Sequence, residues 1–148
     1  MNNLIINSKR SNVQVYFDAF EFAAHKHRSQ KRKGPKGIPY INHPIEVANQ
    51  IVSCMPDAGT ELLVAAILHD TLEDTDTTEE EIEKRYGPMV LSIVREVSDD
   101  MRLPSKKRKK LQVEHAKELS SEARAIKIAD KTCNIRDMLK TKYHWPRR

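Results

Sequence analysis

His69 and Asp70 are the two side chains whose placement in this sequence first points to chemistry. They follow residues 62–68, Leu-Leu-Val-Ala-Ala-Ile-Leu, which are apolar on every side of a predicted helix. Such a helix is normally packed all round, and an ionised carboxylate at its buried end is costly unless it is paired or bound to a metal. Neighbouring helical residues can both reach one ion that lies between them. The His-Asp pair therefore predicts part of a metal site.

His43 and Asp130 are the candidates to complete this site, because one cation takes roughly four to six ligands. His43 begins a second predicted helix, and Asp130 lies on an otherwise apolar face of a predicted C-terminal helix. Each has an alternative when taken alone: a histidine at a helix start is commonly a cap or surface residue, and Asp130 can pair with Lys127 or Lys131. The combination on three helices is more specific. We expect one divalent cation to be bound by His43, His69, Asp70 and Asp130.

Two carboxylates, Glu73 and Asp74, lie one helical turn after His69 and Asp70 in the predicted helix. Acidic residues near a helix C-terminus oppose the macrodipole, and this unfavourable placement favours a functional role: they could orient a water molecule or take its proton. Asn134, one turn beyond Asp130, could hydrogen-bond to a substrate. Histidine and carboxylate ligands without a thiolate favour Mn²⁺, Fe²⁺ or Mg²⁺ over structural zinc.

The charges are segregated along the chain. The formal net charge is +5 and the isoelectric point is near 9.2. Residues 26–36 and 102–110 are basic, whereas residues 70–83 are acidic. This segregation favours a cation site beside a phosphate-binding surface over a single nucleic-acid groove. The basic side chains of residues 26–36 are the candidates for the phosphates, and solvated helix faces are the structural alternative.

Helical periodicity dominates the sequence, so we expect an all-α fold. Ser11 or Asn12 can cap the first helix, and Thr77 with Glu80 or Thr78 with Glu81 forms a capping box for another. Residues 31–42, which contain two Gly and two Pro, predict a loop. The expected helices are about 12–27, 43–55, 61–73, 79–87, 90–97, one that begins at Pro104, and one from Ser120 or Ser121 to about Leu139.

The composition fits one domain, residues 1–148, with an aliphatic core, since hydrophobic residues make up 39% but aromatic residues only 5%. No apolar run approaches the roughly 20 residues that span a bilayer, and the N-terminal apolar stretch is too short for a signal peptide. Cys54 and Cys133 are isolated, which favours a reducing compartment. We therefore expect a cytoplasmic protein without a membrane partner.

Several segments resemble the hydrolase domain of RelA/SpoT proteins. They are Phe22-Ala23-Ala24-His25-Lys26-His27-Arg28, Pro39-Tyr40-Ile41-Asn42-His43-Pro44, Ala66-Ile67-Leu68-His69-Asp70-Thr71-Leu72-Glu73-Asp74-Thr75 and Lys127-Ile128-Ala129-Asp130-Lys131. Residues 108–114 are similar to the small stand-alone branch, the metazoan SpoT homologues and their bacterial relatives. The similarity covers about residues 15–140 and implies a compact HD-domain bundle of about seven helices.

This resemblance implies an enzyme, a guanosine-3′,5′-bis(diphosphate) 3′-pyrophosphohydrolase that uses Mn²⁺ and leaves GDP or GTP. Its partner would be a small guanosine polyphosphate and not a nucleic acid. The 148 residues leave no room for a synthetase domain, so the activity would be hydrolysis alone. The oligomeric state stays open, and a homo-oligomer is one of the possibilities. The site residues that it implies are the metal ligands His43, His69, Asp70 and Asp130, the catalytic carboxylates Glu73 and Asp74, and the substrate contacts Arg28, Arg32, Lys33 and Asn134.

Two features depart from that family. Ser105 follows Pro104 where stand-alone relatives often place a lysine, and relatives usually continue beyond the position of Arg148 with a helical segment that closes part of the substrate pocket. We expect metal binding to be independent of both, and nucleotide affinity and selectivity to depend on them. Three alternatives stay open: a broader phosphatase of NADPH or dNTPs, a truncated nucleotide-binding relative without turnover, and a basic helical module that binds nucleic acid.

Overall fold

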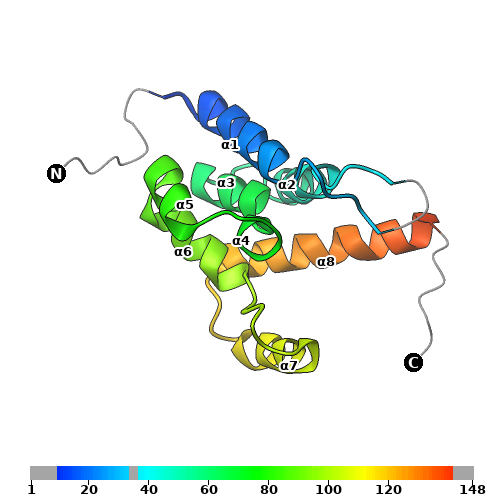
Figure 1. Ribbon diagram of the computed structural model, residues 1–148. Helices are drawn as coiled ribbons and strands as arrows, with labels where there is room; N and C mark the ends of the chain where they lie inside the picture. Colours follow the sequence, from blue (N-terminus) through cyan, green and yellow to red (C-terminus); the bar gives the residue numbers. More distant parts are fainter. Residues whose placement is uncertain (1–9, 34–36, 142–148) are drawn as a thin grey trace.

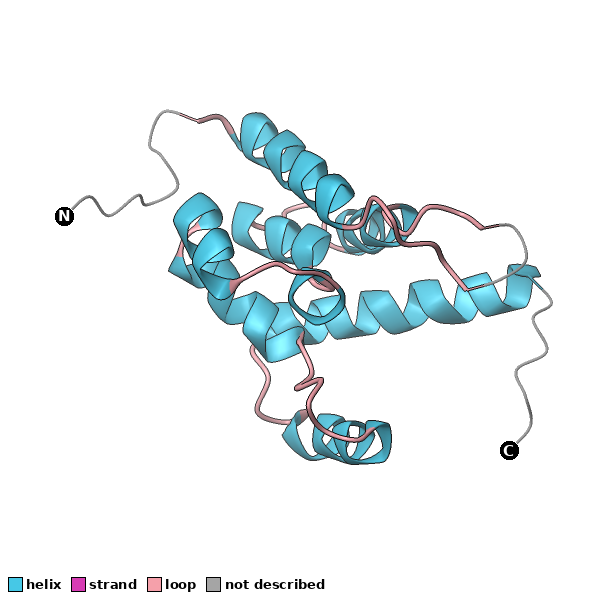
Figure 2. Cartoon of the chain, in the orientation of Figure 1, coloured by secondary structure: helices cyan, strands magenta, loops and turns pink. Residues whose placement is uncertain are grey.

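The computed structural model describes residues 10–33 and 37–141, which form eight helical segments without a named β-strand. The all-α prediction is confirmed, and the helix beyond the expected seven or so is the single turn α4. Figures 1 and 2 show α3 in the middle of a bundle from which α7 stands apart, with α8 running along one side. The helices are α1 (Asn12–Lys26), α2 (Asn42–Cys54), α3 (Thr60–Leu68), α4 (Thr71–Asp74), α5 (Glu79–Tyr86), α6 (Pro88–Val97), α7 (Ser105–His115) and α8 (Ser121–Thr141).

Local signals determine where several helices begin. Ser11 and Gln14 form a capping box at α1, and Thr78 and Glu81 form one at α5, so each of these helices begins at one of the two alternatives that the sequence allowed. Gly87 separates α5 from α6 with a φ of 89°, a left-handed conformation that glycine adopts without steric cost. The predicted loop before α2 is confirmed for residues 31–33 and 37–41, and Asn42 already begins α2; residues 34–36 lie outside the described part.

The predicted third helix, from Glu61 to about Glu73, is wrong in its extent. Helix α3 ends at Leu68, His69 and Asp70 form a turn, and α4 follows as a separate segment. Side chains replace backbone donors at this break: the Thr71 hydroxyl donates to the Leu68 carbonyl at 2.7 Å, and His69 Nδ1 lies 2.8 Å from the Ala66 carbonyl. Such side-chain bonds compete with the helical ladder. Glu73 and Asp74 therefore belong to a short separate turn and not to the end of a long helix.

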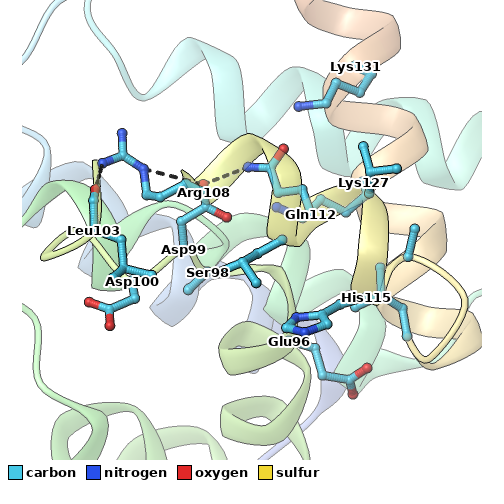
Figure 3. A pocket seen from close by; sticks show the side chains of 14 residues that line it. Glu96, Ser98, Asp99, Asp100, Leu103, Arg108, Gln112, His115, Lys127 and Lys131 are labelled. Carbon is cyan, nitrogen blue, oxygen red and sulfur yellow. Dashed lines mark hydrogen bonds and ion pairs between the residues drawn. The ribbon is translucent and has the colours of Figure 1, made fainter. Parts of the chain in front are cut away.

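Helix α3 is central, as its all-round apolar pattern predicts. It packs against α1, α2, α6 and α8, and its residues Val64, Ala65, Ala66 and Leu68 are fully buried. Helix α7 is the opposite case: it has no buried residue, and Figure 1 shows it apart from the bundle. A pocket of about 480 Å³ lies between α7, the end of α6 and α8 (Figure 3). In the described part of the chain, no helix combines the length and the apolar character that a bilayer span requires.

Replacing Ile67 with alanine is expected to lower the free energy of unfolding by about 2–5 kcal/mol, the usual cost of such a cavity in a close-packed core. Ile67 is 1% exposed, whereas Ile128 on α8 is 67% exposed. The matched control Ile128→Ala is therefore expected to change the stability by no more than about 0.5 kcal/mol. Urea unfolding followed by circular dichroism measures both, and equal effects of the two substitutions would contradict a core centred on α3.

Candidate metal centre

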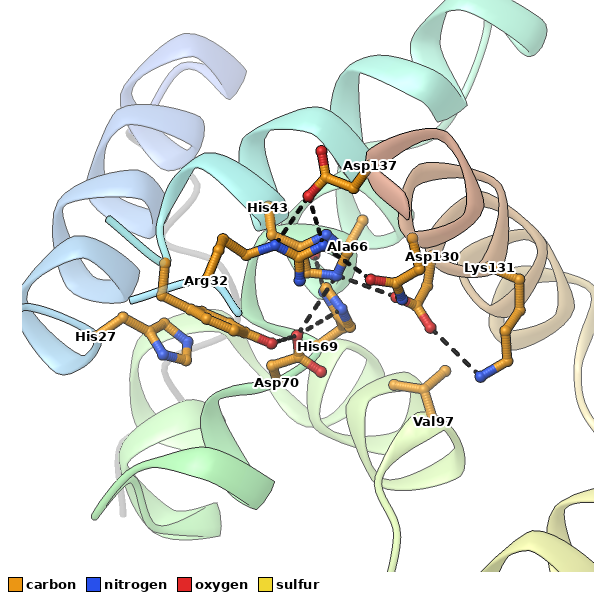
Figure 4. Close-up of polar contacts among 12 residues, drawn as sticks. His27, Arg32, His43, Ala66, His69, Asp70, Val97, Asp130, Lys131 and Asp137 are labelled. Atoms are coloured by element: carbon orange, nitrogen blue, oxygen red, sulfur yellow. Dashed lines mark hydrogen bonds and ion pairs between the residues drawn. The ribbon is translucent and has the colours of Figure 1, made fainter. Parts of the chain in front are cut away.

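Four predicted side chains converge from separate helices at the centre of the bundle. His43 lies in the first turn of α2, His69 and Asp70 in the turn after α3, and Asp130 within α8. His43 Nε2 lies 3.0 Å from Asp130 Oδ1 and 3.8 Å from Asp70 Oδ2, and His69 Nε2 lies 2.9 Å from Asp70 Oδ2. Ligand atoms of His43, His69 and Asp130 all lie within 4.8 Å of one another. Figure 4 shows the four side chains directed toward one another.

The hydrogen bonds of His69 leave one ring nitrogen available to a cation. Because the Ala66 carbonyl can only accept, Nδ1 carries the hydrogen in the 2.8 Å contact, and Nε2 of the neutral ring has a free lone pair. This buried Nε2 has no hydrogen bond of good geometry among the described residues, although Asp70 lies beside it. A backbone carbonyl on the far nitrogen is the usual way in which a metal-binding histidine is oriented. The arrangement fits a divalent cation.

The ionised carboxylates of the cluster are stabilised by a positive charge beside them. Burial raises the pKa of Asp70, but His69 and the Tyr40 hydroxyl outweigh burial and hold that pKa well below its usual range. Burial likewise raises the pKa of Asp130, and the bond from His43 and the charge of His69 reverse the effect. Burial lowers the pKa of His69, yet the Asp70 carboxylate raises it to about 9. These two largely buried carboxylates thus retain their charge, and the proton on His69, which a metal ion would displace, offsets only one of the two charges.

Tyr40 contacts the cluster, although the residue patterns of the sequence predict no role for it. Its hydroxyl donates to Asp70 Oδ2 at 2.7 Å, and burial raises its pKa, so that it remains a neutral donor. Its ring lies 5.9 Å from that of His43 and 4.9 Å from that of the buried His27. The available signal was its place between the Gly-Pro loop and His43. Tyr40 therefore orients a candidate metal ligand from outside the ligand set.

Replacing Tyr40 with phenylalanine is expected to weaken metal binding about 10- to 100-fold, the usual cost of losing a hydrogen-bond partner of a ligand. The matched control is Tyr16→Phe, because the Tyr16 hydroxyl also makes one side-chain contact, to Thr60 at 3.2 Å, but away from the site. Isothermal titration with Mn²⁺ compares the variants. Equal affinities of Tyr40→Phe and wild type would contradict the positioning role of Tyr40.

Glu73 and Asp74 lie in α4, directly after the His-Asp turn. Glu73 is half-buried and accepts a hydrogen bond from the Asp99 backbone N–H at 2.5 Å. Burial, followed by the charges of Asp99 and Asp70, raises the pKa of Glu73 to about 7. Burial and the charge of Asp70 also raise the pKa of Asp74. A carboxyl group with a pKa near neutrality can both accept and return a proton at physiological pH.

A pocket of about 570 Å³ adjoins the cluster and contains most of the predicted substrate contacts. Arg32 donates to Asn134 Oδ1 and to Asp137 Oδ2, both at 2.9 Å, and Asn134 in turn donates to Asp130 Oδ1 at 2.5 Å. The predicted contact Arg28 is exposed, donates to the His25 carbonyl at 2.8 Å and is not part of the pocket wall. The residues that line the pocket are Lys31, Arg32, Lys33, Tyr40, Asp74, Lys131, Asn134, Ile135, Asp137 and Met138.

Comparisons with known proteins agree with this geometry. The HD domain family matches residues 19–147. The chain is 50% identical over 128 residues to the Homo sapiens protein named guanosine-3′,5′-bis(diphosphate) 3′-pyrophosphohydrolase MESH1. The aligned residues cover 86% of this chain and 72% of that protein. A guanosine-3′,5′-bis(diphosphate) 3′-pyrophosphohydrolase of Aquifex aeolicus is 40% identical over 126 residues, 81% of this chain and 17% of that protein.

A solved structure, described as a metazoan ortholog of SpoT that hydrolyzes ppGpp, superposes with a TM-score of 0.85 at 41% identity. The match covers 90% of this chain and 75% of that one. The chain therefore belongs to the HD-domain family and, within it, to the group of the MESH1 proteins. The resemblance in the sequence is confirmed, and the family together with the His/Asp cluster indicates a divalent metal.

Proposed function

We propose that this chain is a Mn²⁺-dependent hydrolase that removes the 3′-pyrophosphate of guanosine tetra- and pentaphosphate and leaves GDP or GTP. The observation that carries the proposal is the largely buried cluster of His43, His69, Asp70 and Asp130, in which His69 Nε2 faces the Asp70 carboxylate at 2.9 Å, beside the Glu73 carboxyl group, whose pKa is raised to about 7. The names of its relatives support the choice of substrate. A mixed nitrogen and oxygen ligand set without thiolates supports Mn²⁺.

The proposed chemistry is the attack of water on the phosphorus bound to the 3′-oxygen. A divalent cation held by the four ligands would lower the pKa of water and polarise the phosphoryl group. Glu73 accepts a proton from the attacking water as the new P–O bond forms. The bond from phosphorus to the 3′-oxygen then breaks, and that oxygen takes a proton and becomes the 3′-hydroxyl. Asp74, which lines the adjoining pocket, orients the water and the departing groups.

The adjoining pocket supplies the groups that a guanosine polyphosphate requires. Arg32 is held by Asn134 and Asp137 and lies 5.8 Å above the Tyr40 ring, so its planar guanidinium is fixed before a phosphate arrives. Lys33 adds a second cation to the same wall, and Ile135 and Met138 add apolar surface for a base. The volume of about 570 Å³ lies within the usual range for small-molecule sites.

A substrate panel tests this proposal. Metal-loaded protein is incubated separately with ppGpp, NADPH and a mixture of dNTPs, and the products are separated by anion-exchange chromatography. We expect ppGpp to be consumed fastest, with GDP and pyrophosphate formed in equal amounts. A clear preference for dNTPs or NADPH overturns the assignment of the substrate. Binding of ppGpp without turnover overturns the assignment of an enzyme and favours a nucleotide-binding relative.

A further inference from the structure

Asp99, in the loop after α6, connects α7 with the rest of the molecule. Its carboxylate accepts a hydrogen bond from Gln112 Nε2 on α7 at 2.6 Å, and Arg108 Nε on the same helix lies 3.7 Å away (Figure 3). The Asp99 side chain is only 17% exposed, although α7 itself has no buried residue. A half-buried carboxylate with two partners on one helix holds that helix in a defined position.

The backbone of the same residue reaches the proposed proton acceptor. The Asp99 N–H donates to Glu73 Oε1 at 2.5 Å, across the space between the loop and α4. The loop is anchored immediately before this point, because Lys127 on α8 donates to the Val97 carbonyl at 2.5 Å. The contacts thus run without interruption from Gln112 on α7, through Asp99, to the carboxyl group of Glu73.

We propose that Asp99 is a positioning residue: its carboxylate, held by Gln112 and Arg108, fixes the backbone amide that orients the Glu73 carboxyl group. The inference rests on the proposed function, because it assigns a role to Glu73 in catalysis. Among the described residues Asp99 makes no hydrogen bond or ion pair with the four proposed ligands, so the role that we assign to it concerns the proton acceptor and not the metal. Helix α7 thereby becomes part of the catalytic arrangement, although it lies outside the bundle.

The steady-state kinetics of four variants test this role. Asp99→Ala and Gln112→Ala each keep the backbone amide but lose the side-chain contact. We expect each to lower kcat about tenfold, part of the 10²–10⁴-fold that a positioned proton acceptor supplies, with KM changed by less than about twofold. The double variant is expected to be no slower than either single one, because both remove the same connection. The control Glu114→Ala, at an exposed α7 residue paired with Lys110, is expected to match wild type.

The conservative variant Asp99→Asn separates positioning from a general effect on the fold. Its amide oxygen can still accept from Gln112, so we expect kcat to stay close to wild type. The charged groups that face Glu73 are Asp99, Asp70 and Lys127, and removal of the Asp99 charge lowers the pKa of Glu73. The acid limb of the pH–rate profile is therefore expected to move to lower pH. An unchanged profile together with wild-type kcat in Asp99→Ala would overturn the proposal.

Amide hydrogen exchange provides a test that is independent of turnover. We expect the Asp99 amide to be protected in wild type and to exchange at least about tenfold faster in Gln112→Ala, whereas Glu114→Ala leaves it unchanged. If wild type hydrolyses none of the nucleotides, the proposed function fails, and faster exchange in Gln112→Ala still supports the connection. Equal exchange in wild type and Gln112→Ala overturns it.

Discussion

Replacing His69 with alanine is expected to reduce Mn²⁺-dependent release of pyrophosphate from ppGpp by at least about 1,000-fold. The substitution removes the buried Nε2 that faces Asp70 and leaves two carboxylates without their cation. Metal-ion catalysis contributes several kcal/mol of transition-state stabilisation, and each 1.36 kcal/mol corresponds to a factor of ten in rate. Initial rates measured over a range of Mn²⁺ concentrations give the size of the loss.

His25 provides the matched control for this prediction. It is an exposed histidine on α1, and we expect His25→Ala to retain wild-type rates. Far-ultraviolet circular dichroism shows whether His69→Ala keeps its helical content, so that a folding defect is distinguished from the loss of a ligand. A folded His69→Ala protein with activity within tenfold of wild type would show that His69 is not required to bind the metal.

Replacing Glu73 with glutamine is expected to lower kcat about 10²- to 10³-fold, the range associated with a positioned proton acceptor. Glutamine keeps an oxygen that can accept the Asp99 N–H, so the geometry is preserved while the basic group is lost. Because Glu73 is not among the proposed ligands, the affinity for Mn²⁺ is expected to change by less than about threefold, which distinguishes it from His69. The exposed Glu80, changed to glutamine, serves as the control.

The raised pKa of Glu73 also predicts a dependence on pH. The ionised form of Glu73 is the proton acceptor, and burial raises its pKa to about 7. We therefore expect the pH profile of kcat/KM to have an acid limb, along which kcat/KM rises as the pH passes through this pKa. A bound cation shifts this acid limb to lower pH. In the Glu73→Gln variant the limb should disappear. A wild-type profile that is flat from pH 5 to pH 8, or a limb that persists in Glu73→Gln, would assign the proton transfer to another group.

The same group predicts how the stability of the metal-free protein changes with pH. Folding raises the pKa of Glu73 from 4.5 to about 7, so the folded state holds a proton that the unfolded state has lost between these values. The contribution of Glu73 to stability is therefore lost as the pH rises from about 4.5 to 7. Thermal melts should show Glu73→Gln to be more stable than wild type at pH 8 and similar to it at pH 4.5. Equal melting temperatures at both pH values would contradict the cost of burying this carboxyl group.

The convergence of the four proposed ligands could be predicted in part because three of them interrupt strong patterns. His69 and Asp70 stand at the end of an apolar helix, and Asp130 stands on an apolar face, so each violates local hydrophobic periodicity. The end of α3 at Leu68 could not be predicted in this way, because it depends on the bonds from Thr71 and His69 to helix carbonyls. The hydrophobic periodicity of the sequence is the same on both sides of this break in the helix, so it gives no sign of the break.

The residues that sequence reasoning missed act through contacts between distant segments. Tyr40 reaches Asp70 across 30 positions, and the Asp99 backbone reaches Glu73 across 26. Tyrosine is not a usual metal ligand, and Asp99 reaches Glu73 through its backbone N–H, which has no sequence signal. The basic stretch of residues 26–36 predicts Arg28 as a substrate contact; in the structure its guanidinium bonds to the His25 carbonyl near the end of α1, and it lies outside the pocket wall. The sequence does not distinguish Arg28 from Arg32, whereas in the structure Arg32 lines the pocket and Arg28 does not.

The central claim, that one divalent cation in this cluster supports cleavage of the 3′-pyrophosphate, is tested most directly by titrating metal-stripped protein with Mn²⁺. Pyrophosphate released from ppGpp and bound metal are measured in the same samples. We predict no release in the stripped protein, and a rise that reaches its maximum as one equivalent of Mn²⁺ binds per chain. His43→Ala should remain inactive at the same concentrations. Full release of pyrophosphate by the stripped protein, or undiminished release by His43→Ala, would contradict the account.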